Sequence, residues 1–203
     1  MPHRRLLLAA PLGLAACGSL LPAQKYTPRT IWPLQPPPPE ATAATGSGKV
    51  LLVRAITAAP GLEARGLQSL AADRSLNVDY YNLWAVPPAE ALTQNLITWA
   101  QASGLFSAVI TPGSRLTPGL MIEGELTQLL VDLPANTARA QMSLLVIKPS
   151  GSIGGFAQPL AQANLTANEP LQGSGPAAQA DAQTKAMAGL LSQAVAQLAR
   201  FAR

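Results

Sequence analysis

Residues 80–110 read YYNLWAVPPAEALTQNLITWAQASGLFSAVI, and this stretch predicts a strand, a turn, a helix and a second strand. The segment Tyr80–Trp84 is rich in residues that favour a pleated, largely buried strand. Pro87 and Pro88 cannot donate hydrogen bonds to a sheet, so the strand ends before them. A proline at the first helical position loses no hydrogen bond, and the helix is therefore expected to begin at this pair.

An apolar stripe predicts the helix itself, because its members recur at three- and four-residue steps. The stripe consists of Ala89, Leu92, Leu96, Trp99 and Ala100. Gly104 is suited to end the helix in the left-handed conformation. Leu105–Ile110 then resumes as a short apolar strand, so the stretch forms a strand–helix–strand unit with tight joints.

The rest of the pattern predicts one domain of the α/β (α+β) class. Further strands are expected at Val50–Ile56, at Leu67–Ala72 and Leu76–Trp84 as a hairpin, and at Leu120–Leu133, Ala138–Ile147 and Phe156–Ala167 as a meander, with Pro159 as the point where the last would break. Val50–Ile56 is almost continuously apolar and is expected to be buried on both faces. Residues 177–201 have apolar residues at helical spacing, which predicts a long amphipathic helix. Its opposite face carries Gln, Ser and Ala rather than many lysines, which favours packing on the sheet over lying on a membrane surface. We expect a mixed sheet of about six or seven strands with two main helices packed on it.

The N-terminal residues predict a lipoprotein signal peptide over residues 1–16. A basic start precedes the apolar run LLLAAPLGL, which is shorter than the roughly 20 residues that a spanning helix needs. Leu14-Ala15-Ala16-Cys17 resembles the bacterial lipoprotein box, which implies cleavage between Ala16 and Cys17 and acylation of Cys17. The alternative is an ordinary cleavage site beside a chance cysteine. Lipidation is favoured because Cys17 is the one cysteine of the chain and stands where the lipid is attached.

Residues 17–48 predict a tether, and residues 49–203 the folded periplasmic domain. The proline run at 36–39 favours an extended polyproline II chain of about 3.1 Å per residue. Apolar and aromatic residues interrupt the tether at Tyr26, Ile31, Trp32 and Leu34. Whether they dock the tether onto the domain stays open at this point. In lipoproteins, Gly18 rather than aspartate after the cysteine favours the periplasmic face of the outer membrane.

Charge argues against a nucleic-acid partner. Charged residues make up 12% of the chain, and the net charge of +4 falls to +2 once Arg4 and Arg5 leave with the signal peptide. The remaining basic residues are scattered singly, so no cluster follows a phosphate backbone.

The residues for common catalytic sites are missing as well. The one histidine, His3, lies in the predicted signal peptide, and the one cysteine is the lipidation site; this removes histidine-based triads and zinc sites. Glu123 and Glu125 form the only close carboxylate pair; a metal or glycosidase site is one interpretation, and a solvated strand face is the one we favour. Gly46-Ser47-Gly48-Lys49 lacks the first glycine and the Ser/Thr of a phosphate-binding loop. We expect no enzyme, no cofactor and no metal site.

The order of these features resembles the ABC-type transport auxiliary lipoprotein family, over roughly residues 50–200. The matching segments are the lipoprotein box, VLLVRAITAAPGL at 50–62, the stretch at 80–110 and LMIEGEL at 120–126. The central resemblance is carried by Tyr81, Trp84, Ala85, Pro87, Pro88, Ser103, Gly104 and Phe106. It implies a non-catalytic periplasmic domain, anchored in the outer membrane, that serves an ABC transporter and an MCE-domain protein in moving phospholipid or other hydrophobic molecules between two membranes. It also implies assembly of the domain as a homo-oligomeric ring.

Two other classes share the anchor, the tether and the lack of catalytic groups. One is a structural or assembly lipoprotein of another envelope complex, and the other is a periplasmic carrier that itself holds a lipid. For Tyr81 and Trp84 we expect core positions, with a surface that binds a partner as the alternative.

Overall fold

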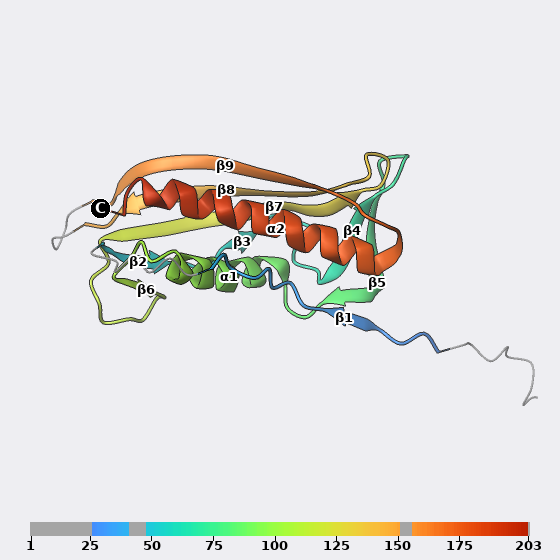
Figure 1. Ribbon diagram of the computed structural model, residues 1–203, viewed down its shortest axis with the longest axis horizontal. Coiled ribbons are helices and arrows are strands. Elements are labelled where there is room, and N and C mark those ends of the chain that lie inside the picture. The colour runs from blue at the N-terminus through green and yellow to red at the C-terminus, as the bar shows by residue number, and fades with distance from the viewer. Residues whose placement is uncertain (1–25, 41–47, 151–155, 203) are drawn as a thin grey trace, which may run out of the picture.

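The computed structural model describes residues 26–40, 48–150 and 156–202, and within them one mixed sheet carries two helices (Figure 1). The elements in chain order are β1 (Thr30–Trp32), β2 (Val50–Val53), β3 (Thr57–Ala58), β4 (Gly66–Leu70), β5 (Leu76–Trp84), α1 (Pro88–Ala102), β6 (Ala108–Ile110), β7 (Leu120–Asp132), β8 (Thr137–Lys148), β9 (Gln158–Pro170) and α2 (Gly175–Ala199). The expected class, a mixed sheet with two helices in a single domain, is confirmed. The nine strands in the described ranges exceed the expected number, because the tether contributes β1 and the two-residue β3 adds another.

The long strand β7 organises the sheet. One edge of β7 pairs antiparallel with β8 along its length, and β8 pairs antiparallel with β9. The other edge is shared by three short strands in succession, β2, β3 and β4, all parallel to β7. Beyond β2 lies β6, and beyond β4 lie β5 and then β1. The two strands that flank α1 in the chain, β5 and β6, therefore lie at opposite ends of this shorter half of the sheet (Figure 1).

Both helices cover the same face of the sheet and contact each other. Helix α2 lies along β8 and β9, while α1 packs beside it on β2, β3 and β7 (Figure 1). Strand β8 shows the consequence, because buried residues alternate with half-buried ones along it. The buried set of β8 is Ala138, Ala140, Met142, Leu144 and Val146. Leu92 and Leu96 of α1 and Leu190 of α2 are fully buried in one continuous core with this set.

The first strand of the domain differs from the expectation. The expected strand Val50–Ile56 ends already at Val53 as β2, and it is not buried on both faces. Leu51 and Val53 are buried, whereas Val50 and Leu52 are half-buried. The physical reason is that both helices lie on one face, so the other side of the strand has no covering layer.

The strand–helix–strand unit folds as residues 80–110 predict, except that its last strand is shorter. Strand β5 ends at Trp84, α1 begins at Pro88, and Gly104 follows the helix with a φ of 64°. The second strand begins only at Ala108, and Leu105 lies in the preceding loop. The hairpin of β4 and β5 is also confirmed, with the turn around Asp73–Ser75.

The meander of β7, β8 and β9 is confirmed, but its third strand is not broken at Pro159. Strand β9 runs on to Pro170, and a register shift between Val146 and Ile147 of β8 accommodates the proline. In the described residues β9 pairs with β8 alone, and an edge strand tolerates proline because one of its sides has no ladder to complete. Helix α2 begins at Gly175, slightly earlier than expected. None of the helices within the described ranges has the length and apolar character needed to cross a bilayer.

Candidate functional site

Part of the predicted tether is packed onto the domain. Residues Thr30–Trp32 form β1 in parallel register with the end of β5, so that Trp32 pairs with Trp84. The N–H of Ala85 donates to the Trp32 carbonyl at 2.8 Å. Leu34, two residues later, is only 1% exposed and belongs to the core. The question that the sequence left open is thereby answered for this segment, which docks through Trp32 and Leu34.

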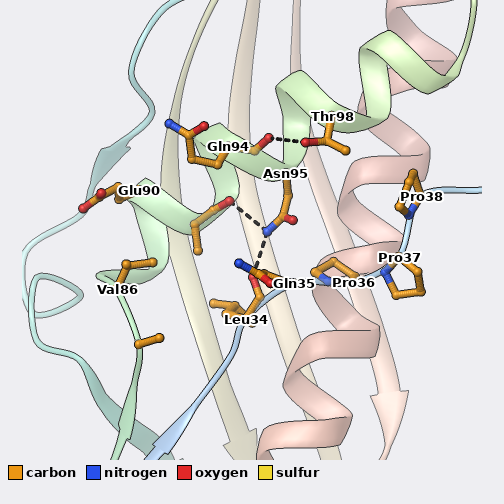
Figure 2. A pocket seen from close by; sticks show the side chains of 12 residues that line it. Leu34, Gln35, Pro36, Pro37, Pro38, Val86, Glu90, Gln94, Asn95 and Thr98 are labelled. Carbon is orange, nitrogen blue, oxygen red and sulfur yellow. Dashed lines mark hydrogen bonds between the residues drawn. The ribbon is translucent and has the colours of Figure 1, made fainter.

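Two buried side chains of α1 hold the docked segment. The Asn95 Nδ2 donates to the carbonyl oxygen of Leu34 at 2.8 Å (Figure 2), and the Trp99 Nε1 donates to that of Pro36 at 3.2 Å. Proline has no N–H, so a proline-rich segment offers carbonyl acceptors more than donors. Helix α1 supplies the matching donors, and the segment is bound through its backbone.

A groove of about 370 Å³ lies between this segment and α1 (Figure 2). Its lining includes Pro36, Pro37, Pro38, Val86, Glu90, Gln94, Asn95 and Thr98. Among the described residues, Glu90 is the only titratable side chain that lines the groove, and the remaining polar groups are amides, carbonyls and a hydroxyl. This chemistry suits the binding of an extended backbone rather than acid–base catalysis.

A bulge in β5 creates a second feature at the end where β1 lies. The register between β4 and β5 shifts from Gly66↔Leu83 to Gln68↔Val78, so the residues from Asp79 to Asn82 protrude. The Asp79 carboxylate accepts hydrogen bonds from the backbone N–H groups of Tyr81 and Asn82 at 2.7 and 3.0 Å, which stabilises the bulge. A Cβ at Gly66 would lie 2.5 Å from the Asp79 carbonyl oxygen, so only glycine allows this close approach.

The bulge exposes two tyrosines. Tyr80 is 65% exposed and Tyr81 is 44% exposed, and their ring centroids lie 5.1 Å apart in an edge-to-face arrangement. The guanidinium carbon of Arg29 lies 4.1 Å from the centroid of the Tyr80 ring. Ile31, two residues further along the strand-forming segment, is 51% exposed. We call these four residues, Arg29, Ile31, Tyr80 and Tyr81, the tyrosine patch.

The residues that carry the family resemblance separate into core and surface. Trp84 is 1% exposed and Phe106 8%, so both are core residues, and the expectation for Trp84 is confirmed. The expectation of a core position for Tyr81 is wrong, because the bulge turns its ring outward. Pro88 is buried at the start of α1, while Pro87 and Gly104 are half-buried at its two ends.

The lipidation and cleavage residues, Cys17 and Ala16, lie outside the described residues, so both stay predictions. Of the tether residues, Tyr26 is 84% exposed and takes no part in the docking contacts described above.

Several of the described carboxylates take part in hydrogen bonds or ion pairs within the fold. Glu123 accepts a hydrogen bond from Arg54 in an exposed ion pair. Its neighbour Glu125 pairs in register with Ser143 on β8. Across the described ranges no group of three His, Cys, Asp or Glu side chains could hold a metal ion. Hydrogen bonds from Ser75 lower the pKa of Asp73, and the carboxylate of Asp181 raises the pKa of Lys185, both at exposed positions.

Residues 32–199 match the family described as the ABC-type transport auxiliary lipoprotein component. The chain belongs to this family, and the match begins at Trp32, the last residue of β1, so it includes the docked residues Trp32, Leu34 and Pro36.

Solved structures share the fold. Protein XCC0632 from Xanthomonas campestris, of the family DUF330, is similar with a TM-score of 0.73 and 17% identity over 85% of this chain and 95% of its own. A second crystal structure, of an uncharacterized protein, has a TM-score of 0.61 and 15% identity over 86% and 98% of the two chains. The hypothetical protein CT253 from Chlamydia trachomatis has a TM-score of 0.53 and 10% identity over 76% and 98%. No curated protein matches the chain in sequence.

Proposed function

We propose that the protein is a non-catalytic, lipid-anchored subunit of a system that moves phospholipid or other hydrophobic molecules between the two membranes of the cell envelope. The family match over residues 32–199 carries this proposal, since that family is described as an auxiliary component of ABC-type transport. An ABC transporter and an MCE-domain protein are the proposed partners, and the domain is proposed to assemble as a homo-oligomeric ring. No nucleic acid is among the proposed partners.

The proposed anchor is Cys17 with diacylglycerol on its sulfur and an acyl chain on its new amino group, at the periplasmic face of the outer membrane. The docked segment would connect this anchor to the domain, because the carbonyl oxygens of Leu34 and Pro36, within the tether, accept hydrogen bonds from buried donors of α1. A pull on the anchor would therefore be transmitted to the folded domain through β1 and α1.

A non-catalytic role agrees with the ion pairs that three of the described acidic side chains form. Glu123, Asp132 and Asp181 each form an ion pair, with Arg54, Arg139 and Lys185 respectively. The groove beside α1 is lined chiefly by amide, proline and aliphatic groups. These are groups that bind and position a chain.

A crosslinking pull-down from native envelopes tests the proposal. The full-length lipoprotein is compared with a Cys17→Ser control that cannot be acylated. We expect recovery of an MCE-domain protein and of ABC transporter subunits with the lipidated form, and a reduced yield with the control. Recovery of a β-barrel or peptidoglycan-linked protein without any MCE-domain protein would replace the proposal with the assembly-lipoprotein alternative. Phospholipid extracted in stoichiometric amount from the purified protein would favour the carrier alternative.

A further inference from the structure

The chemistry of the tyrosine patch matches that of a bilayer surface. Tyrosine rings combine an apolar body with a polar hydroxyl, and such side chains collect at the boundary between lipid headgroups and hydrocarbon. Tyr80 and Tyr81 expose their rings side by side, and the cationic Arg29 lies over the Tyr80 ring. The exposed aliphatic Ile31 stands two residues later on β1, in register with Leu83 of β5. A guanidinium at this position suits lipid phosphates, because the cytoplasmic or periplasmic surface of a phospholipid layer presents them to basic side chains.

The one acidic side chain of the bulge, Asp79, is engaged in hydrogen bonds within the bulge. Both carboxylate oxygens of Asp79 accept hydrogen bonds, Oδ1 from two backbone N–H groups and Oδ2 from the Asn82 Nδ2 at 2.8 Å. The exposed apolar surface also continues along β5, where Leu76 is 50% and Val78 43% exposed. The charge that the patch itself presents is that of Arg29.

The position of the patch in the chain favours the membrane that holds the lipid anchor as the surface it contacts. Arg29 directly precedes β1, so the tether enters the domain at the patch itself. At most about 3.3–3.6 Å per residue, the chain from Cys17 to Arg29 reaches roughly 40 Å. Helix α2, at about 1.5 Å per residue, is itself close to 40 Å long. A membrane that holds Cys17 is therefore within one domain length of the patch, and β1 lies at the opposite end of the molecule from β6 (Figure 1).

We propose that the tyrosine patch rests on the phospholipid surface of the membrane that holds the lipid anchor. This inference rests on the proposed function, since it needs an acylated Cys17. The contact orients the domain, with the β1 and β5 end at the membrane and the segment between β6 and β7 directed away from it.

The test uses the full-length acylated protein in vesicles of phosphatidylethanolamine and phosphatidylglycerol that contain a nitroxide-labelled lipid. Acylation occupies the one native cysteine, so an introduced cysteine can be labelled uniquely with an environment-sensitive fluorophore. Tyr80→Cys and Ile31→Cys carry the label in the patch, and Leu116→Cys carries it at an exposed site between β6 and β7. Because the label is placed at two positions of the patch, one variant still reports on the contact if the other fails to fold.

We expect several-fold stronger quenching and a blue-shifted emission at positions 31 and 80 than at position 116. Adding Tyr81→Ser to the Ile31→Cys protein should weaken that quenching. Equal quenching at both ends, or none at 31 and 80, overturns the membrane contact and leaves a protein partner as the occupant of the patch. Flotation of the same samples separates the two proposals, because a protein that fails to float with the vesicles contradicts the anchor, whereas one that floats without quenching contradicts only the patch.

Discussion

The side-chain amide of Asn95 donates to the carbonyl oxygens of Leu34 and Ala91, each at 2.8 Å, and so joins the tether to α1. Asn95 itself is 8% exposed, and Leu34 is almost fully buried beside it. A segment that its composition predicts to be an extended spacer thus has a specific binding site on the domain it carries. The joint lies between the proposed lipid anchor and the rest of the fold.

Asn95→Ala should destabilise the protein by about 1–3 kcal/mol, because it leaves the buried Leu34 carbonyl without its donor. The measurement is urea unfolding followed by tryptophan fluorescence. Gln94→Ala is the matched control, since Gln94 is the exposed neighbour on the same helix and should change the free energy of unfolding by less than about 0.5 kcal/mol.

Hydrogen exchange distinguishes local loosening of the docked tether segment from destabilisation of the whole domain. In Asn95→Ala, the backbone amides of Trp32 in β1 and of Ala85, which donates to the Trp32 carbonyl, should exchange faster, while those at the centre of β8 stay protected. Unchanged exchange in β1 would show that strand pairing alone holds the tether, and that Asn95 only packs.

Trp84→Ala and Tyr81→Ala should differ sharply although the two residues are close in sequence. Trp84 is 1% exposed, so its truncation leaves a core cavity and should cost about 3–5 kcal/mol. Tyr81 is 44% exposed, and its truncation should cost less than about 1 kcal/mol. Thermal denaturation of both variants checks this; similar melting temperatures would contradict the outward position of Tyr81.

Gly189→Ala should destabilise the protein although alanine is the better helix former. A Cβ at Gly189 would lie 2.8 Å from the Cβ of Ala167 on β9, and overpacking of this kind costs about 1–3 kcal/mol. Ser192→Ala, at an exposed position of the same helix, serves as the control. A double variant that adds Ala167→Gly should recover part of the loss, because it removes the clashing atom; no recovery would place the strain elsewhere.

The turn between β4 and β5 should show a small acid-dependent loss of stability. The Ser75 hydroxyl and N–H donate to Asp73 Oδ1 at 2.6 and 3.0 Å, and these bonds lower the pKa of Asp73. A lowered folded-state pKa means that the contribution is present at neutral pH and is lost as the pH falls below about 4. The difference in unfolding free energy between wild type and Asp73→Asn should therefore shrink on acidification. A difference that grows toward low pH would contradict the sign.

Local patterns predicted the elements well where a single physical rule dominated. Pro88 starts α1 and Gly104 follows its end, because proline and glycine restrict or free the backbone regardless of tertiary context. The strict alternation in β8 likewise follows from one covered face. The expectation for Val50–Ile56 was wrong because an apolar run predicts that residues are buried, but it does not predict whether one or both faces of the sheet are covered.

The sequence alone determined the α+β class, the hairpin and meander, the two helices and the order of features that matches the family, because these depend on local propensity and periodicity. Only the tertiary structure decided whether the tether docks on the domain and whether the tyrosine rings are buried or exposed. Leu34 is buried because its side chain packs in the hydrophobic core, while Asn95 and Trp99, far away in the chain, donate hydrogen bonds to the backbone carbonyls of this segment. Tyr81 is exposed because Asp79 stabilises a bulge that Gly66 of the neighbouring strand makes room for. Both outcomes depend on contacts between residues distant in sequence, and no local pattern carries that information.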